Sequence, residues 1–326
     1  MAKEWLRRGI PGLAIAVAVR GHIVYSEAFG YADLEQHVPV RRHTRFRVGS
    51  VSKPLTAVAL MQLVEAGKID LDAPVQNHVP SFPVKPEGTI TARLLAGHLS
   101  GIRNYQGDEF HIQKHYASVL DGLEIFKNDP LTSAPGEKYN YSSFDFDLLS
   151  AVIQSASGET FAVYMQKHVF APLGLRDTLA DENGHIIERR ARFYEPQKDG
   201  SVTNAPYVDN SYKWAAGGFL STAEDLVHFG SAMLQPGFLK EESLALLFTS
   251  QKTSKGEETG YGMGWNVHLS QSGKHVYEHV GGAAGGSADL ILYPDSRLVV
   301  ALVANYPLGT WKTDEVEKVG EGFEKR

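Results

Sequence analysis

The most informative segment of this chain is residues 50–65, which read SVSKPLTAVALMQLVE. Positions 55–64 are apolar in all but two places, and a helix that is apolar all round belongs in the interior of a protein. Pro54 is tolerated only in the first turn of a helix, where the backbone N–H groups have no helical acceptor. The pattern therefore predicts a buried helix from Ser52 to Glu65, with Ser50 at its N-terminal end.

The same segment holds the one S-x-x-K pattern of the chain, formed by Ser50 and Lys53. About one such match is expected by chance in a chain of this length, so its position matters more than its presence. At a spacing of three on a helix, the hydroxyl and the amine share one face, and the helix N-terminus favours a developing anion there. Burial would lower the pKa of Lys53 and let its amine act as a base. The plainer alternative is a helix-capping serine followed by a lysine whose amine reaches solvent.

Strand patterns occupy both ends of the chain. Two β-rich runs, at 13–19 and 23–29, predict a first hairpin. The runs 288–293 and 298–305 predict a second hairpin. An amphipathic helix follows, with apolar positions at 316, 319 and 323 that would lie on a sheet face.

Between these ends, the pattern favours helices and loops. From residue 70 to about 190, short helical runs are broken by seven prolines, and alternating strand patterns are few. We therefore predict an α/β (α+β) fold with an antiparallel sheet built from both ends of the chain. Residues 1–70 and 200–326 would form the sheet domain, and residues 71–199 would form an inserted, mainly helical domain.

Composition excludes several classes of function. With 326 residues the chain can bury a full-sized core, and with no cysteine it cannot use a thiol nucleophile, a disulfide framework or Cys-bound zinc. The 32 basic and 38 acidic residues give a net charge of −6 without a clustered basic stripe, so nucleic acid is not an expected partner. No segment reaches the roughly 18 apolar residues that a membrane span requires. We expect no cofactor or metal, and we interpret the i, i+4 pair His111 and His115 as surface residues.

Two further clusters carry groups suited to catalysis. The first is Tyr141-Ser142-Ser143, which follows the turn at Pro135-Gly136, although its tyrosine could equally be a packing residue. The second is HVGGAAGG at 279–286, directly before the predicted strand at 288. Glycines let a ligand approach a strand edge closely, and a backbone N–H there could stabilise an oxyanion. The alternative is a flexible loop with an exposed His279.

In this order, the three clusters resemble the active-site signature of the penicillin-recognising serine hydrolases, specifically the class C β-lactamase-like group. That group also contains DD-peptidases and carboxylesterases, and the resemblance implies the β-lactamase/DD-peptidase-like fold. It covers nearly the whole chain and is carried, besides the three clusters, by Pro11-Gly12, Phe46 to Lys53, Leu63 to Leu71, Leu99-Ser100-Gly101-Ile102, Pro135-Gly136 and the final hairpin. The stretches 190–194 and 204–222 are similar to a mitochondrial branch of the group and its bacterial relatives.

The resemblance implies a role for each matching residue. Ser50 would be the acylated nucleophile, Lys53 its proton-transfer partner, and Tyr141 a second general base or acid. The backbone N–H groups of Ser50 and Gly282 would form the oxyanion hole. Free lysine and tyrosine are both poor bases at neutral pH, so the site must shift their pKa values. Residues expected to contact substrate are Ser143, His279 and Gly281, with Tyr212 and Trp214 as candidates for a pocket wall or, alternatively, as core aromatics.

Two departures from the family pattern bear on the substrate. Ser143 stands where the family usually has asparagine, and its shorter side chain reaches substrate amides less well. His279 stands where true β-lactamases have lysine, so a mostly neutral imidazole replaces the cation that would pair with a substrate carboxylate. We therefore expect a metal-free serine hydrolase that forms an acyl-enzyme and acts on esters or on peptide and amide bonds. Relatives in the mitochondrial branch share this histidine and are regarded as proteases.

Several alternatives stay open. The chain could be a non-catalytic or weakly active scaffold, a true β-lactamase, or a Ser-His-Asp hydrolase with His279 as its base. The partner would be a small ester, peptide or β-lactam substrate, and some relatives also self-assemble into homo-oligomers. The compartment is open, because family members are often extracytoplasmic or mitochondrial and no targeting segment is recognised.

Overall fold

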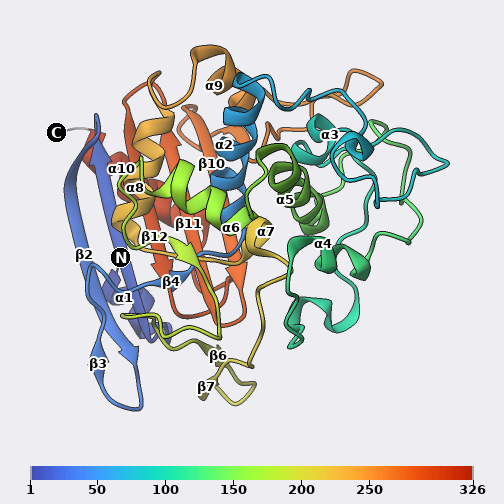
Figure 1. Cartoon of the computed structure of the whole chain (residues 1–326). Helices are drawn as coiled ribbons and strands as arrows, with labels where there is room; N and C mark the ends of the chain where they lie inside the picture. Colours follow the sequence, from blue (N-terminus) through green and yellow to red (C-terminus); the bar gives the residue numbers. More distant parts are fainter. Residues whose placement is uncertain (1, 325–326) are drawn as a thin grey trace.

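The computed structural model describes residues 2–324 and is organised around one seven-stranded antiparallel sheet (Figure 1). The strand order is β3-β2-β1-β12-β11-β10-β9, so strands from both ends of the chain meet where β1 pairs with β12. The strands are β1 (Gly12–Val19), β2 (His22–Asp33), β3 (Val38–Pro39), β9 (Asn266–Leu269), β10 (His275–Ala283), β11 (Gly286–Tyr293) and β12 (Leu298–Ala304).

The two predicted hairpins are confirmed as β1–β2 and β11–β12. The glycine-rich run is mostly a strand, so its alternative interpretation as a flexible loop is wrong. Residues 279–283 belong to β10, which pairs with β11 from Tyr277–Leu292 to Ala283–Gly286. Only Ala284 and Gly285 form the turn between these two strands, and Gly285 has the positive φ of +63° that such a turn favours.

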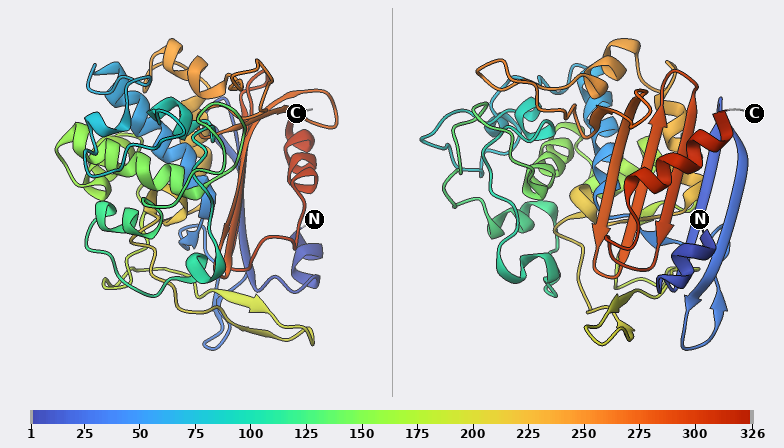
Figure 2. Two further views of the ribbon diagram at one scale, coloured as in Figure 1. Left: turned by 90° about the vertical axis from the view of Figure 1, so that its right-hand side faces the viewer. Right: turned by 180° about the vertical axis from the view of Figure 1, so that it is seen from behind.

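Helices cover both faces of the sheet, as the edge-on view of Figure 2 shows. Side chains of β12 alternate between two cores, with Val299, Ala301 and Val303 on one face and Val300 and Leu302 on the other. The second face is covered by α1 (Ala2–Arg7) and α10 (Thr313–Glu324). The predicted amphipathic helix is confirmed as α10, whose residues at 316, 319 and 323 pack on this core.

The first face is covered by α2 (Ser52–Glu65), α8 (Ala223–Met233) and the helices around them. Helix α2 has the predicted bounds, and every residue from Ser52 to Met61 is buried. A short 3-10 helix, η1 (Gly49–Val51), leads into it. Beside η1 lies a small three-stranded sheet of β4 (Phe46–Arg47), β8 (Phe219–Ser221) and β5 (Leu179–Ala180), in the order β4-β8-β5.

Residues 71–199 are mostly helices and loops, as predicted. Figure 1 shows α3 (Ala92–Ala96), α4 (Val119–Gly122) and α5 (Ser143–Ser157) beside α2 and away from the large sheet. Helix α5 packs against both α2 and α7 (Trp214–Gly217). The division of the chain at residues 70 and 200 stays a prediction. The remaining elements are η2 (Val75–Asn77), η3 (Gly107–His111), η4 (Leu123–Ile125), α6 (Phe161–Tyr164), the π-helix η5 (Met165–Phe170), β6 (Tyr194–Pro196), β7 (Val202–Asn204) and α9 (Glu241–Phe248).

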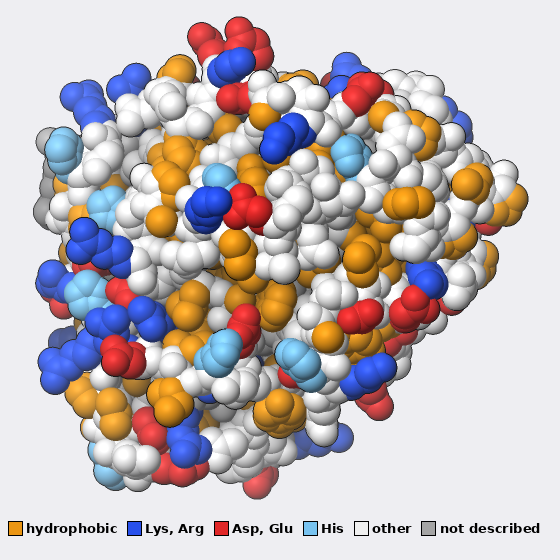
Figure 3. Space-filling model, viewed as in Figure 1, with side chains coloured by type: hydrophobic (Ala, Val, Ile, Leu, Met, Phe, Trp, Pro, Cys, Tyr) orange, Lys and Arg blue, Asp and Glu red, His pale blue; other side chains and the backbone are white. Residues whose placement is uncertain are grey.

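On the face shown in Figure 3, basic and acidic side chains of the described residues are interspersed, with no continuous basic stripe. Within residues 2–324, no helix is both long and apolar enough to cross a membrane.

Candidate active site

Ser50 and Lys53 meet at the start of α2. Lys53 Nζ lies 3.1 Å from Ser50 Oγ and 3.4 Å from Ser143 Oγ, and it donates a hydrogen bond of 2.8 Å to the Ala216 carbonyl in α7. The lysine is fully buried, whereas Ser50 is half-buried. The N-cap of α2 is Val51 and has no side-chain cap. The alternative of a capping serine beside a solvated lysine is therefore wrong.

Burial lowers the pKa of Lys53 to about 7. Desolvation is the largest cause, because moving an ammonium out of water disfavours its charged form. Negative charge on the carboxyls of Asp147 and Asp145 would act in the opposite direction, and the ammonium of Lys213 adds to the lowering. An amine with this pKa is present in both protonation states near neutral pH, so it can accept a proton and return it.

Tyr141 lies two residues before α5, with its ring centroid 4.8 Å from Lys53 Nζ. Burial raises the pKa of Tyr141 well above its usual range, and the nearby Ser50 hydroxyl only partly opposes this. The phenol is therefore protonated at neutral pH and is better suited to donating or relaying a proton than to acting as the resting base.

Ser143 is the first residue of α5 and points at the same lysine. Its backbone N–H donates to Asn104 Oδ1 at 3.0 Å. Burial raises the pKa of the neighbouring Tyr105 well above its usual range, and the Ser143 hydroxyl partly opposes this. The structure thus brings Ser143 into the predicted cluster through Lys53. Asn104 and Tyr105 come from a loop that the sequence reasoning did not single out.

The glycines of β10 are needed because this strand packs directly against η1. A Cβ at Gly281 would lie 1.9 Å from the Val48 carbonyl oxygen and 3.0 Å from Ser50 N. Gly49 has a φ of +50°, and a Cβ there would lie 2.6 Å from Gly282 N. Bulkier residues would separate the two backbones, so the glycines keep the N–H of Gly282 next to the segment that carries Ser50.

His279 is buried in β10, so the alternative of a flexible loop with an exposed histidine is wrong. Its Nδ1 donates to the Val280 carbonyl at 2.8 Å, which leaves Nε2 to accept from the Tyr261 hydroxyl at 2.9 Å. Desolvation, with a smaller contribution from Lys53, lowers the pKa of His279 to about 3. The imidazole is therefore neutral, and neither of its hydrogen-bond partners is Ser50.

The two aromatic candidates lie in different surroundings. Tyr212 is 1% exposed and donates to the Glu109 carbonyl, which fits the core alternative and not a pocket wall. Trp214 is half-buried and lines a pocket of about 270 Å³ together with His115 and Asp209. His111 and His115 are exposed, as predicted, and His115 Nδ1 lies 3.2 Å from Asp209 Oδ2.

Several buried ionisable groups near the site were missed by the sequence reasoning. Asp145 and Asp147 lie on α5, His98 follows α3, and Lys213 precedes α7, and all four are buried. Both carboxylate oxygens of Asp147 lack a hydrogen-bond partner within the described part of the chain. Two acidic residues inside an otherwise apolar helix were a visible signal, but their partners are distant in sequence.

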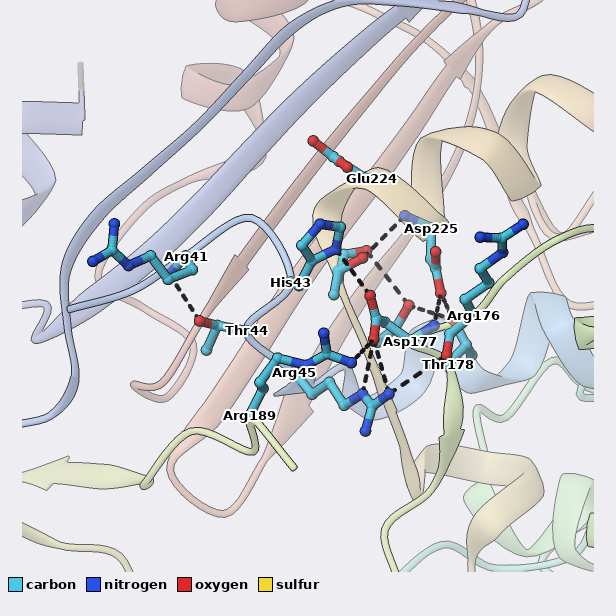
Figure 4. A network of polar contacts seen from close by, with 12 residues as sticks. Arg41, His43, Thr44, Arg45, Arg176, Asp177, Thr178, Arg189, Glu224 and Asp225 are labelled. Carbon is cyan, nitrogen blue, oxygen red and sulfur yellow. Dashed lines mark hydrogen bonds and ion pairs between the residues drawn. The ribbon is translucent and has the colours of Figure 1, made fainter. Parts of the chain in front are cut away.

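Buried ion pairs fix the segment that leads to η1. Arg47 Nε lies 2.7 Å from Asp181 Oδ2, and its guanidinium also donates to the Ala284 carbonyl at the β10–β11 turn. Two residues earlier, Arg45 pairs with Asp177 at 2.8 Å, and Figure 4 shows Arg189 and His43 directed at the same carboxylate. These contacts tie the approach to Ser50 to the small sheet.

Comparison with known proteins identifies the family that has this fold and arrangement. The sequence model of the Beta-lactamase family matches residues 1–317, and the chain belongs to that family, whose members are mostly serine hydrolases. This confirms the predicted resemblance and the predicted fold class.

Individual relatives resemble the chain over almost its whole length. "Serine beta-lactamase-like protein LACTB, mitochondrial" from Homo sapiens is 36% identical over 380 residues, which cover 88% of this chain and 69% of the human protein. A penicillin-binding protein from Bacillus halodurans has a TM-score of 0.84 at 25% identity, covering 99% of this chain and 98% of that one. A D-stereospecific amidohydrolase from Streptomyces sp. has a TM-score of 0.83 at 25% identity, covering 97% and 95%.

Proposed function

We propose that this protein is a serine hydrolase that forms an acyl-enzyme on Ser50 and cleaves peptide, amide or ester bonds. The observation that carries the proposal is the contact between the Ser50 hydroxyl and the amine of Lys53, a buried base with a pKa of about 7, which lie 3.1 Å apart. The phenol of Tyr141, protonated because burial raises its pKa, packs over the same amine with its ring centroid 4.8 Å from Nζ. A proton acceptor thus contacts the hydroxyl and a proton donor lies beside it, as nucleophilic acyl transfer requires.

In the proposed reaction, neutral Lys53 accepts the proton of Ser50 as Oγ forms a bond to the substrate carbonyl carbon. The carbonyl oxygen becomes an oxyanion, which the N–H groups of Ser50 and Gly282 stabilise. Tyr141 donates its proton to the leaving amine or alcohol as the scissile bond breaks, and the proton held by Lys53 restores the phenol. Water then attacks the acyl-enzyme, with the same groups moving the proton in the opposite direction.

The neutral state of His279 supports a substrate with no carboxylate at that position. Its two ring nitrogens are already occupied by Val280 and Tyr261, so β10 presents no permanent cation there. This favours esters and internal peptide or amide bonds over β-lactams, whose carboxylate would lack its usual partner. The similarity to an amidohydrolase from Streptomyces sp. agrees with an amide substrate.

The rival Ser-His-Asp mechanism is less well supported. A histidine base must hydrogen-bond the nucleophile and be oriented by a carboxylate. His279 bonds to a tyrosine and a carbonyl instead, while Lys53 contacts Ser50 directly. We therefore expect Lys53→Ala to abolish turnover, and His279→Ala to cause only a partial loss with an altered pH profile. Equal losses in the two variants would favour the histidine mechanism.

The decisive experiment is intact-protein mass spectrometry after incubation with a fluorophosphonate. We expect one adduct on the wild type, none on Ser50→Ala, and an unchanged adduct on Ser272→Ala, which removes an exposed serine. No adduct on the wild type would support the scaffold alternative, and an equal adduct on Ser50→Ala would place the nucleophile elsewhere. A panel of short-chain esters, D- and L-peptide amides and a chromogenic cephalosporin then separates esterase, peptidase and β-lactamase activity.

A further inference from the structure

One buried residue, His98, binds the backbone on both sides of Tyr141. Its carbonyl accepts the N–H of Asn140 at 2.9 Å, and its ring Nδ1 lies 3.3 Å from the N–H of Ser142. The imidazole also packs against the Tyr141 ring, with centroids 4.3 Å apart. His98 therefore fixes the chain before Tyr141, the chain after it, and one face of the phenol itself.

A carboxyl from α5 fixes the ring of His98 in turn. Asp145 Oδ2 lies 2.9 Å from His98 Nδ1, Asp145 Oδ1 accepts from the Ser100 hydroxyl, and Ser100 Oγ accepts the N–H of Ile102 at 2.9 Å. The three side chains at 98, 100 and 145 are all buried. The His98 cluster, defined as these three side chains, thus connects the loop after α3 to the first turn of α5.

The hydrogen bonds of this cluster favour one placement of its protons. A backbone N–H can only donate, so the 3.3 Å bond from Ser142 requires the tautomer in which Nδ1 of His98 carries its lone pair. In that tautomer the proton between Nδ1 and Asp145 belongs to the carboxyl, a neutral acid, and the two donors share the single lone pair of Nδ1. Burial raises the pKa of Asp145 and lowers that of His98, in agreement with two neutral groups. The remaining ring proton, on Nε2, has no hydrogen-bond partner within residues 2–324 and lies near the rings of Tyr141 and Tyr261.

The backbone of His98 is held in an uncommon conformation. Its φ is +56°, in the left-handed region that residues other than glycine rarely adopt. Such a conformation persists when surrounding contacts determine it, and here the carbonyl bond to Asn140 and the ring bonds supply those contacts. Substitutions that keep the fold but remove the ring acceptor should therefore loosen the backbone next to Tyr141.

We propose that His98, with Asp145 as a neutral acid holding its ring, is the positioning residue for Tyr141. This inference rests on the proposed function, in which Tyr141 donates a proton to the leaving group. Among the contacts described, His98 bonds to the segment of Tyr141 and has none to Ser50. Its removal should therefore lower kcat and leave KM little changed, because small displacements of a reacting group slow the chemical step far more than binding.

The test compares variants that differ in one hydrogen-bonding atom. His98→Phe keeps an aromatic ring but has no acceptor, whereas the amide oxygen of His98→Asn can replace Nδ1. Asp145→Asn can still donate to Nδ1 and accept from Ser100 if the native carboxyl is neutral. The matched control is His111→Asn, which changes an exposed histidine. Each variant is examined by thermal denaturation, by ester kinetics over pH, and by the NMR resonance of the ¹³C-labelled Tyr141 phenol carbon, assigned with Tyr141→Phe.

We expect His98→Phe to lower kcat by roughly tenfold or more with KM within about twofold, and His98→Asn to recover most of the loss. Asp145→Asn should retain kcat and its pH profile. An unchanged kcat in His98→Phe, or no recovery in His98→Asn at equal thermal stability, would overturn the positioning role. A shifted pH profile in Asp145→Asn would overturn the neutral acid. If the wild type shows no turnover, the proposed function fails, but the Tyr141 resonance still decides whether His98→Phe alone displaces the phenol.

Discussion

Replacing Lys53 with methionine should abolish activity and at the same time stabilise the protein. The pKa of Lys53 falls from 10.5 in the unfolded chain to about 7 in the native structure. At about 1.4 kcal/mol per pKa unit, this difference corresponds to about 5 kcal/mol of destabilisation when the native lysine is charged. Methionine removes that penalty but leaves the Ala216 carbonyl without its donor, which costs about 1–3 kcal/mol. The expected net gain below pH 7 is about 2–4 kcal/mol.

The pH dependence gives the prediction its sign. Between pH 7 and 10.5 the unfolded chain holds the Lys53 proton and the native protein does not, so wild-type stability rises with pH in this window. The advantage of Lys53→Met should therefore fall by about 3 kcal/mol between pH 6 and pH 9. Urea denaturation of both proteins over this range measures the difference, with Lys198→Met as an exposed control. A variant less stable than the wild type at pH 6, or a difference that does not change with pH, would refute a buried, readily deprotonated lysine.

Three further predictions concern the surroundings of the site. Arg47→Met should destabilise the protein by about 1.5–3 kcal/mol, because the buried Asp181 loses one charged partner and keeps Arg190 and Asn210. In Arg47→Met/Asp181→Asn the effects of the two substitutions on the free energy of unfolding should be far from additive in urea denaturation. Gly281→Ala should destabilise the protein by about 1–3 kcal/mol or prevent its folding, because the new Cβ would overlap the Val48 carbonyl. The control Gly322→Ala adds a helical Cβ that meets no atom within 4 Å, so it should raise the melting temperature. Asp289 is buried, neither of its oxygens has a hydrogen-bond partner among the described residues, and burial raises its pKa, so its contribution to stability is lost as pH rises. The stability advantage of Asp289→Asn over the wild type should therefore grow from pH 4 to pH 8, and a difference in denaturation midpoint that stays constant with pH would contradict this.

Local patterns predicted the elements that position the site. The bounds of α2 followed from a continuous apolar run with a proline in its first turn, and the two hairpins followed from short β-rich runs around turns. Such patterns are reliable because each depends on residues close together in sequence. The fold itself followed from where the strands fall, since strands at both ends of a chain can form one sheet only if the middle is inserted between them.

Burial and long-range pairing could not be predicted in the same way. His279 was open to interpretation as exposed because glycines surround it, yet β10 packs on η1 and covers it. The bond between His98 and Asp145 spans 47 positions, and nothing near either residue announces the other. Tyr212 carries the same sequence signal whether it lines a pocket or fills a core, and only the packing decides.

The all-round apolar character of α2 accounts for both its fold and its chemistry. A helix with one apolar face would leave Lys53 at the edge of water, where its pKa would stay near 10 and its amine could not accept a proton from Ser50 at neutral pH. Because α2 packs against α5 and α7 and Lys53 is fully buried, the lysine is desolvated and its pKa falls to about 7. Ser50 lies two residues before α2, in η1, and keeps partial access to solvent. The boundary between η1 and α2 therefore separates the solvent-accessible nucleophile Ser50 from the desolvated base Lys53. Extending the apolar run of α2 to residues before this boundary would bury Ser50 as well.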